Sequence, residues 1–247
     1  MHGFANPARF LRLARWLTPL LLLGGTVITA VALGWGLFFA PAESLQGETV
    51  RILYIHVPAA WLGMAGWMAI AAASLAELVW RHPLAAIAAR AAAAPGAFYT
   101  AACLVTGSLW GRPAWGTWWV WDGRLTSMLV LLFLYFGYIA LAQASENDDV
   151  GGWRVTAIFG LVGAVNIPII HYSVLWWNSL HQPPSITMGK SAMAPDFLVP
   201  LLVATLGFSL ILGGVVLARM RAILADMQAE ARLRRKAMAA SDVEAEA

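Results

Sequence analysis

The stretch RLTSMLVLLFLYFGYIALAQA, residues 124–144, begins with Arg124 and then runs for twenty residues without another charged side chain. The apolar core of a bilayer is about 30 Å thick, and a helix needs about 20 apolar residues to cross it. This stretch therefore predicts a membrane-spanning helix. A helix of this kind satisfies its own backbone hydrogen bonds in lipid, where water is absent.

Five further stretches have the same character, and they cover residues 17–40, 57–80, 91–109, 155–172 and 197–218. The chain of 247 residues is 60% hydrophobic and 12% charged, against about 45–50% and about 25% in a typical soluble domain. We therefore expect an all-α polytopic membrane protein in which residues 1–247 form one integral membrane domain with six transmembrane helices. This composition excludes an ordinary soluble enzyme and a nucleic-acid-binding protein.

The lysine and arginine residues are distributed unevenly between the predicted loops. Twelve of the 16 lie on the side of the two termini, and the other four are Arg51, Arg112, Arg124 and Lys190. Cytoplasmic loops carry the excess of positive charge, so both termini are predicted to be cytoplasmic, with residues 220–247 as a cytoplasmic tail. The loops 41–56, 110–123 and 173–196 then face outward.

The outward loop between the third and fourth helices contains five Trp within 13 residues. An interfacial aromatic belt needs one or two Trp at each helix end, so this density favours a binding surface. If the loop is helical, Trp115, Trp118, Trp119 and Asp122 share one face and form a shelf for a flat, apolar ligand. Asp122 then accepts hydrogen bonds from indole N–H groups or caps the following helix.

Three of the five histidines, His56, His171 and His181, fall on the outward side. A pair of them is what the two axial positions of a metal porphyrin require, and all three together are a possible zinc site, although no HExxH motif occurs. The proline at position 58 is expected to open the second span and to fix His56. The spacing does not choose between His171 and His181 as its partner. We interpret His2 and His82, on the cytoplasmic side, as structural.

The remaining charged and reactive side chains restrict the possible kinds of site further. The outward arginines Arg51, Arg112 and Arg124 are candidates for pairing with the propionates of a haem, or anchors at lipid headgroups. We expect Glu77, which lies near a cytoplasmic helix end, to pair with Arg81 or to extend toward water. The single cysteine, Cys103, excludes an intramolecular disulfide and a CxxC motif.

The motif Trp115-Gly-Thr-Trp118-Trp119-Val-Trp121-Asp122 resembles the tryptophan-rich WWD proteins that handle haem. The surroundings of His56, Ile-His-Val-Pro-Ala-Ala-Trp, and of His181, Trp-Trp-Asn-Ser-Leu-His-Gln, extend this resemblance. With six spans the chain is similar over nearly its whole length to the CcmC family of bacterial cytochrome c maturation. Longer WWD relatives that attach haem to apocytochrome have more spans.

The resemblance implies that haem b is bound at the periplasmic face of the bacterial inner membrane. It implies His56 and His181 as axial ligands and gives His171, Trp176 and Trp177 a supporting or alternative role. The implied platform is Trp115, Gly116, Trp118, Trp119, Trp121 and Asp122. The implied partners are the haem chaperone CcmE, which receives the haem, the ABC pair CcmA and CcmB, and CcmD.

Three functions are candidates for a chain with these residues. The first is haem binding and transfer to CcmE, with no general base or nucleophile that marks a conventional enzyme, although assistance in the covalent attachment of haem to CcmE is compatible with it. The alternative is a permease subunit of an ABC-type exporter that moves haem or another amphipathic solute. That alternative predicts polar or broken helices in mid-membrane, whereas the polar residues here gather at the outer edge. The third, a redox protein, needs a second cofactor.

Overall fold

The computed structural model describes residues 6–145, 152–177, 179–182, 185–187 and 190–245, so His2 lies outside the described residues. In this part of the chain, six helical segments are long and apolar enough to cross a membrane. The all-α fold with six spans is therefore confirmed. The elements are α1 Pro7–Gly34, the π-helix Trp35–Phe39, the 3₁₀ helix Glu48–Ile52, α2 Leu53–Trp80, α3 Ala85–Trp115, α4 Gly123–Ala144, α5 Gly152–Gly163, α6 Asn166–Trp176, β1 Ile186–Thr187, β2 Lys190–Ser191 and α7 Pro195–Ala245.

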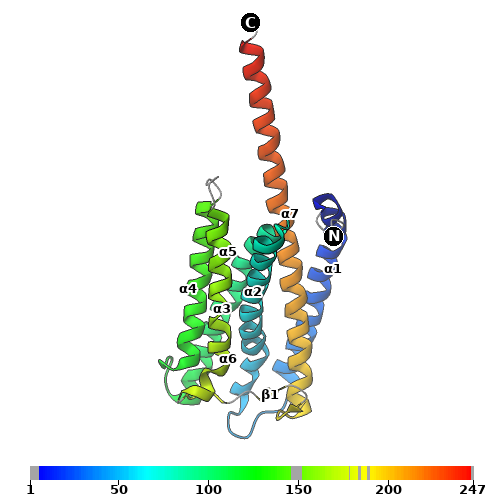
Figure 1. The fold of residues 1–247 in the computed structure, drawn as a ribbon. Helices are drawn as coiled ribbons and strands as arrows, with labels where there is room; N and C mark the ends of the chain where they lie inside the picture. Colours follow the sequence, from blue (N-terminus) through cyan, green and yellow to red (C-terminus); the bar gives the residue numbers. More distant parts are fainter. Residues whose placement is uncertain (1–5, 146–151, 178, 183–184, 188–189, 246–247) are drawn as a thin grey trace.

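The helices run side by side in one bundle (Figure 1). Helix α1 begins at the same end at which α7 extends far beyond the other helices, so the first and last helices share one end of the molecule. The opposite end carries the Trp-rich segment between α3 and α4 and the hairpin of β1 and β2. We call this opposite end the loop end. Which end faces the cytoplasm stays a prediction from the charge distribution.

The middle of the bundle is filled by aromatic side chains of α2 and α4. Trp67 is fully buried, and its ring centroid lies 4.9 Å from that of Tyr135 and 6.1 Å from that of Tyr138. The polar atoms of Trp67 and Tyr135 are satisfied, since Trp67 Nε1 donates to the Gly160 carbonyl at 3.1 Å and the Tyr135 hydroxyl donates to the Gly63 carbonyl at 2.7 Å. Buried polar groups with partners stabilise a single packing of the core.

Helices α2 and α3 are longer than the spans predicted from hydropathy. Helix α2 begins at Leu53, so the expectation that Pro58 opens this helix is wrong. Proline inside a helix removes one hydrogen bond and disturbs the carbonyl four residues earlier, here that of Tyr54. The 3₁₀ turn Glu48–Ile52 and the packing of the fully buried Pro58 outweigh that loss. His56 consequently lies within a continuous helix.

The predicted helix over residues 155–172 is broken near its middle, into α5 and α6. The break falls at Ala164 and Val165, whose N–H groups bond three residues back instead of four. Pro168 explains it, because the proline ring clashes with the carbonyl of Ala164. The buried Asn166 begins α6 and donates to the Ser127 carbonyl at 2.9 Å. Polar groups therefore also occur at mid-span, in contrast to the expectation that they gather at the outer edge.

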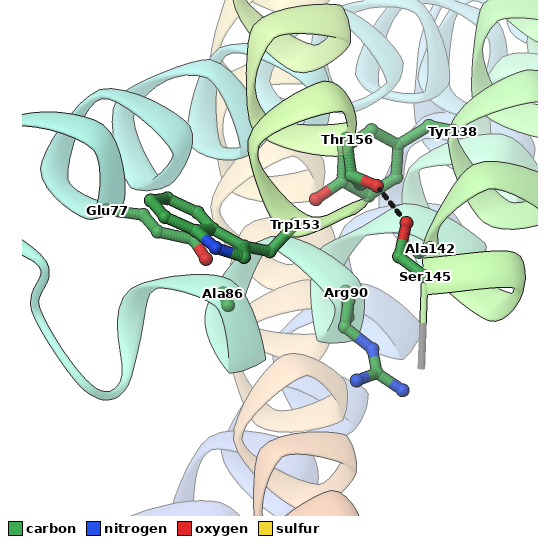
Figure 2. A pocket seen from close by; sticks show the side chains of 8 residues that line it. All are labelled: Glu77, Ala86, Arg90, Tyr138, Ala142, Ser145, Trp153 and Thr156. Atoms are coloured by element: carbon green, nitrogen blue, oxygen red, sulfur yellow. Dashed lines mark hydrogen bonds between the residues drawn. The ribbon is translucent and has the colours of Figure 1, made fainter. Parts of the chain in front are cut away.

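At the end of the bundle near the termini, Glu77 lines a pocket of about 80 Å³ (Figure 2). Arg90, Tyr138 and Trp153 line the same pocket. No ion pair joins Glu77 to Arg81 among the residues that the structure describes, so the expected pairing is not observed. Arg81 instead adopts a left-handed backbone conformation (φ 48°) that ends α2.

Candidate functional site

The Trp-rich segment is not a helix beyond Trp115. Helix α3 ends there because Gly116 has a φ of 77°, a conformation that glycine adopts without strain. The guanidinium of Arg112 donates to the Gly116 carbonyl and closes this turn. Residues 116–122 are irregular, so the prediction that four side chains share a helical face is wrong.

The indoles of this segment consequently differ in exposure. Trp115 and Trp119 are half-buried, whereas Trp118 and Trp121 are 55% and 75% exposed. Trp115 packs over Gly111, since a Cβ on that glycine would lie 3.2 Å from the indole. Trp119 and Trp121 contact each other edge-on, with centroids 5.5 Å apart. The segment therefore has an inner pair and an outer pair of indoles.

His56 is held by α3. Its Nδ1 lies 3.1 Å from the Cys103 carbonyl oxygen and 3.0 Å from Thr106 Oγ1. Because a carbonyl can only accept, Nδ1 carries the proton, and Nε2 keeps the lone pair that a metal could take. Trp110 lies edge-on to the imidazole at 5.6 Å, and its own N–H donates to Gln46 Oε1 at 2.8 Å.

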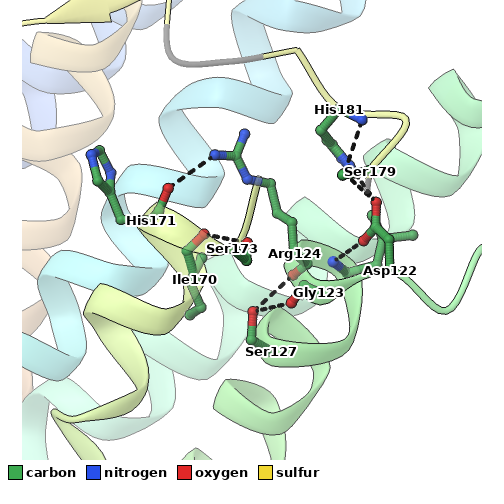
Figure 3. A network of polar contacts seen from close by, with 10 residues as sticks. Asp122, Gly123, Arg124, Ser127, Ile170, His171, Ser173, Ser179 and His181 are labelled. Atoms are coloured by element: carbon green, nitrogen blue, oxygen red, sulfur yellow. Dashed lines mark hydrogen bonds and ion pairs between the residues drawn. The ribbon is translucent and has the colours of Figure 1, made fainter. Parts of the chain in front are cut away.

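His181 is held by the Trp-rich segment. Its Nδ1 lies 3.0 Å from Oδ2 of Asp122, and its ring lies edge-on to Trp115, with centroids 4.8 Å apart. Asp122 Oδ1 accepts from the Leu125 N–H at 2.8 Å, which confirms it as the N-cap of α4. Asp122 Oδ2 also accepts from the Ser179 hydroxyl at 2.6 Å. Residues distant in sequence thus form one compact network (Figure 3).

Burial and hydrogen bonding determine the charges in this network. Burial raises the pKa of Asp122, but hydrogen bonds from Ser179, the Leu125 N–H and His181 outweigh it, and the pKa stays below its ordinary value. Burial lowers the pKa of His181 more than the hydrogen bond to Asp122 raises it. At neutral pH the carboxylate is therefore ionised and the imidazole neutral, which is the form that binds metals.

The three outward arginines differ in what they contact. Arg124 interacts electrostatically with both His56 and His181, and its Nη2 donates to the His171 carbonyl at 3.3 Å. Arg51 has its contacts elsewhere: its two terminal nitrogens donate to the Leu37 carbonyl and, at 3.1 Å, to the Ala40 carbonyl, and its Nε lies 2.8 Å from Glu48 Oε2 in an ion pair. Of these two arginines, the structure brings Arg124 to the histidines and keeps Arg51 at the start of α2.

His171 differs from the other two outward histidines in its exposure. Its imidazole is exposed and lies edge-on to Tyr172 at 4.8 Å. Tyr172 stacks on Trp176 at 5.8 Å, and Trp177 packs over Gly123 at the start of α4. Within the described ranges, no group of three or more His, Cys, Asp or Glu side chains could hold an ion, so the three histidines do not assemble a zinc site there.

A cavity of about 590 Å³ opens beside the network, between α4 and α6. It shares Asp122 with the network but is lined by neither His56 nor His181. Sequence reasoning also missed Thr106, Trp110 and Ser179 as neighbours of the histidines. Ser179 lies two residues before His181 in an already noted motif, while Thr106 and Trp110 follow from the helical spacing of α3 only once its register against α2 is known. The cavity lining is Trp121, Asp122, Gly123, Thr126, Ser127, Val130, Asn166, Ile169 and Trp177.

These features define a class of multi-pass membrane protein in which one end of a helical bundle carries a Trp-rich segment and two oriented histidines. The chain belongs to the CcmC family, because the sequence profile of that family, described as heme exporter protein C, matches residues 1–235.

Individual relatives agree with this assignment, and each is named heme exporter protein C. The protein from Bradyrhizobium diazoefficiens is 50% identical over 218 residues, which cover 88% of this chain and 82% of that protein. The protein from Escherichia coli K12 is 45% identical over 228 residues, 92% of each chain. The protein from Rhodobacter capsulatus is 38% identical over 239 residues, 96% of this chain and 98% of that protein. The similarity therefore extends over nearly the whole chain.

Proposed function

We propose that this protein binds haem as its cargo at the loop end of the bundle, and that this end faces the periplasm from the bacterial inner membrane. The observation that carries the proposal is the orientation of His56 and His181. Each directs Nδ1 at an oxygen acceptor, which leaves Nε2 for a metal. The names of the relatives, which include heme, support the same cargo.

The residues at the loop end fit a haem. The imidazoles of His56 and His181 would both ligate the iron and so withhold it from oxygen chemistry. The guanidinium of Arg124 supplies the positive charge that a propionate requires. Trp115, in edge contact with His181, offers apolar surface to the porphyrin. A non-covalent haem b suits this set, because Cys103 is buried within α3 and no CxxC motif occurs.

Release of the cargo is the second half of the proposal. The haem passes to the chaperone CcmE, and the chain works beside CcmA, CcmB and CcmD in an ABC-type assembly. His181 and the Trp-rich segment lie in irregular backbone outside the helices, where a partner can reach them. This role needs no conventional enzymatic reaction, although the site can assist covalent attachment of haem to CcmE.

The test is the absorbance spectrum, with haem quantified, of the purified protein beside His56→Ala, His181→Ala and His171→Ala. We expect low-spin haem in the wild type, a loss or spectral shift in the first two variants, and a wild-type spectrum in the third. Loss of haem in His171→Ala alone contradicts the ligand assignment. Absence of haem from every sample contradicts the function itself.

One observation favours the alternative of a permease subunit. The break between α5 and α6, with the buried Asn166 beside it, is the kind of interruption found in transporters. The fully buried Trp67 and Tyr135 argue against a path through the bundle, because they fill its middle. Haem uptake into vesicles containing the protein, compared with Asn166→Leu, tests this alternative. Uptake that is lost in Asn166→Leu, with haem binding retained, favours the permease.

A further inference from the structure

Asp122, which lies between α3 and α4, connects three groups, two from the loop after α6 and one from α4. Its Oδ1 accepts from the Leu125 N–H, while its Oδ2 accepts from Ser179 and His181. Its side chain is only 3% exposed. Both carboxylate oxygens are therefore occupied inside the protein, and the side chain offers little surface to a ligand.

We propose that Asp122 and Ser179 are the positioning residues of His181: together they hold its imidazole with the proton on Nδ1, so that Nε2 is presented to the cargo. The aspartate of the Trp-rich motif then serves the histidine and not the platform on which a porphyrin lies. This inference rests on the proposed function only for the identity of the cargo.

The contacts of Ser179 make the arrangement specific. Its hydroxyl donates to Asp122 Oδ2 at 2.6 Å and accepts from the backbone N–H of His181 at 3.1 Å. The same oxygen, Oδ2, lies 3.0 Å from His181 Nδ1. Ser179 thus holds both the carboxylate and the backbone of the histidine. An ionised carboxylate only accepts, which leaves His181 as the donor through Nδ1.

The two histidines consequently differ as ligands. His56 donates to neutral oxygens, those of Cys103 and Thr106, within rigid helices. His181 donates to a carboxylate, and such a hydrogen bond raises the basicity of a metal-binding imidazole. We infer that His181 is the stronger donor to iron and that its strength depends on the Trp-rich segment, because Asp122 belongs to that segment.

Asp122→Asn separates this role from helix capping. Asparagine caps helices about as well as aspartate, so α4 keeps its N-cap while the charge that holds the imidazole proton is removed. Ser179→Ala removes the second support and leaves the carboxylate in place. Ser191→Ala is the matched control, since Ser191 lies in β2, also between α6 and α7, and its hydroxyl accepts a local bond from the Met193 N–H.

The first measurement is made without haem, on the full-length protein in detergent. Nitrogen NMR of ¹⁵N-labelled imidazoles reports which nitrogen carries the proton, and His181→Ala identifies the signals. We expect an Nδ1–H tautomer in the wild type and in Ser191→Ala, a mixture rich in Nε2–H in Asp122→Asn, and an intermediate result in Ser179→Ala. A purely structural role would leave the tautomer unchanged.

The second measurement uses protein loaded with haem. We expect Asp122→Asn to raise the reduction potential of the iron and to weaken haem binding by roughly tenfold, the loss of about 1.4 kcal/mol. An unchanged tautomer in Asp122→Asn overturns the proposal, whatever happens to haem. If the wild type binds no haem but the tautomer shifts as expected, the positioning role stands and the proposed cargo fails.

Discussion

Gly107 on α3 faces the imidazole of His56 on α2, and a Cβ at Gly107 would lie 3.0 Å from His56 Cε1. The adjacent ring atom, Nδ1, is fixed on the same helix, because it bonds to the Cys103 carbonyl and to Thr106. The imidazole cannot move away from a larger side chain without losing those bonds. A glycine on one helix thus sets the position of a candidate ligand on its neighbour.

Gly107→Val is expected to displace His56 and to weaken haem binding by at least about tenfold, because overpacking forces side chains out of position. Titration of the purified variant with haem measures the loss. Gly24→Val is the matched control, since a Cβ at Gly24, also within a membrane helix, meets nothing within 4 Å. Haem affinity in Gly107→Val equal to that of the control would contradict the role of His56.

In the core, Gly163 leaves the space that the buried side chain of Trp67 occupies. A Cβ there would lie 2.2 Å from Trp67 Cζ2, and Trp67 is held by its bond to the Gly160 carbonyl. We expect Gly163→Ala to lower the free energy of unfolding by about 1–3 kcal/mol, the usual cost of overpacking. Unfolding in mixed detergent micelles measures it, with Gly24→Ala as the control. Equal stability of the two variants would contradict this expectation, because it would show that the backbone at the break after Gly163 shifts to accommodate the added methyl group.

The sequence predicted the spans and the N-cap of α4 because these depend on local composition. Residues 124–144 have the length of a span in their apolar run alone. Asp122 is a preferred cap residue directly before that run. Helix α2 begins earlier than the sequence predicts, because packing around the buried Pro58 overrides the local preference of proline for a helix start. The prediction of a helical face in the Trp-rich segment is wrong for a local reason, because Gly116 ends α3.

The contacts between histidines and their supports could not be predicted in the same way. Asp122 and His181 are 59 residues apart, and His56 and Thr106 are 50 apart. Neither spacing follows a helical or strand period, so only the packing of α2 against α3 and of one loop against another brings these pairs together. The sequence motif indicates the candidate residues, and the structure shows which of them contact one another.

The indoles at the loop end are expected to contribute unequally. Trp115 contacts His181 and is half-buried, whereas Trp121 is 75% exposed and lines the neighbouring cavity. Trp115→Ala should therefore weaken haem binding by roughly 10–100-fold, on the scale of about 1–3 kcal/mol for stacking on one aromatic side chain. Trp121→Ala should weaken it less. Trp80→Ala, at the other end of the bundle, is the control, and haem titration ranks the three. A larger loss in Trp121→Ala than in Trp115→Ala would place the haem in the cavity between α4 and α6.

Substitutions of Arg124 and of Arg51 are expected to affect different properties of the protein. Arg124→Gln is expected to weaken haem binding by roughly 10–100-fold, since a hydrogen bond to a charged group contributes about 1.5–3 kcal/mol. Arg51→Gln should instead lower the stability of the bundle and leave haem binding intact, because the Arg51 donors hold Leu37, Ala40 and Glu48. Haem titration and unfolding of both variants separate the two effects.

The chemical partner of Arg124 can be tested with a modified ligand. Haem dimethyl ester lacks the propionate charges, so the wild type should bind it about as weakly as Arg124→Gln binds haem. The ester should then bind to the variant and to the wild type equally, because the interaction that the substitution removes is already absent from the ligand. If Arg124→Gln weakens the binding of haem and of the ester by the same factor, Arg124 acts through the histidines, whose electrostatic environment it shares, and not through a propionate.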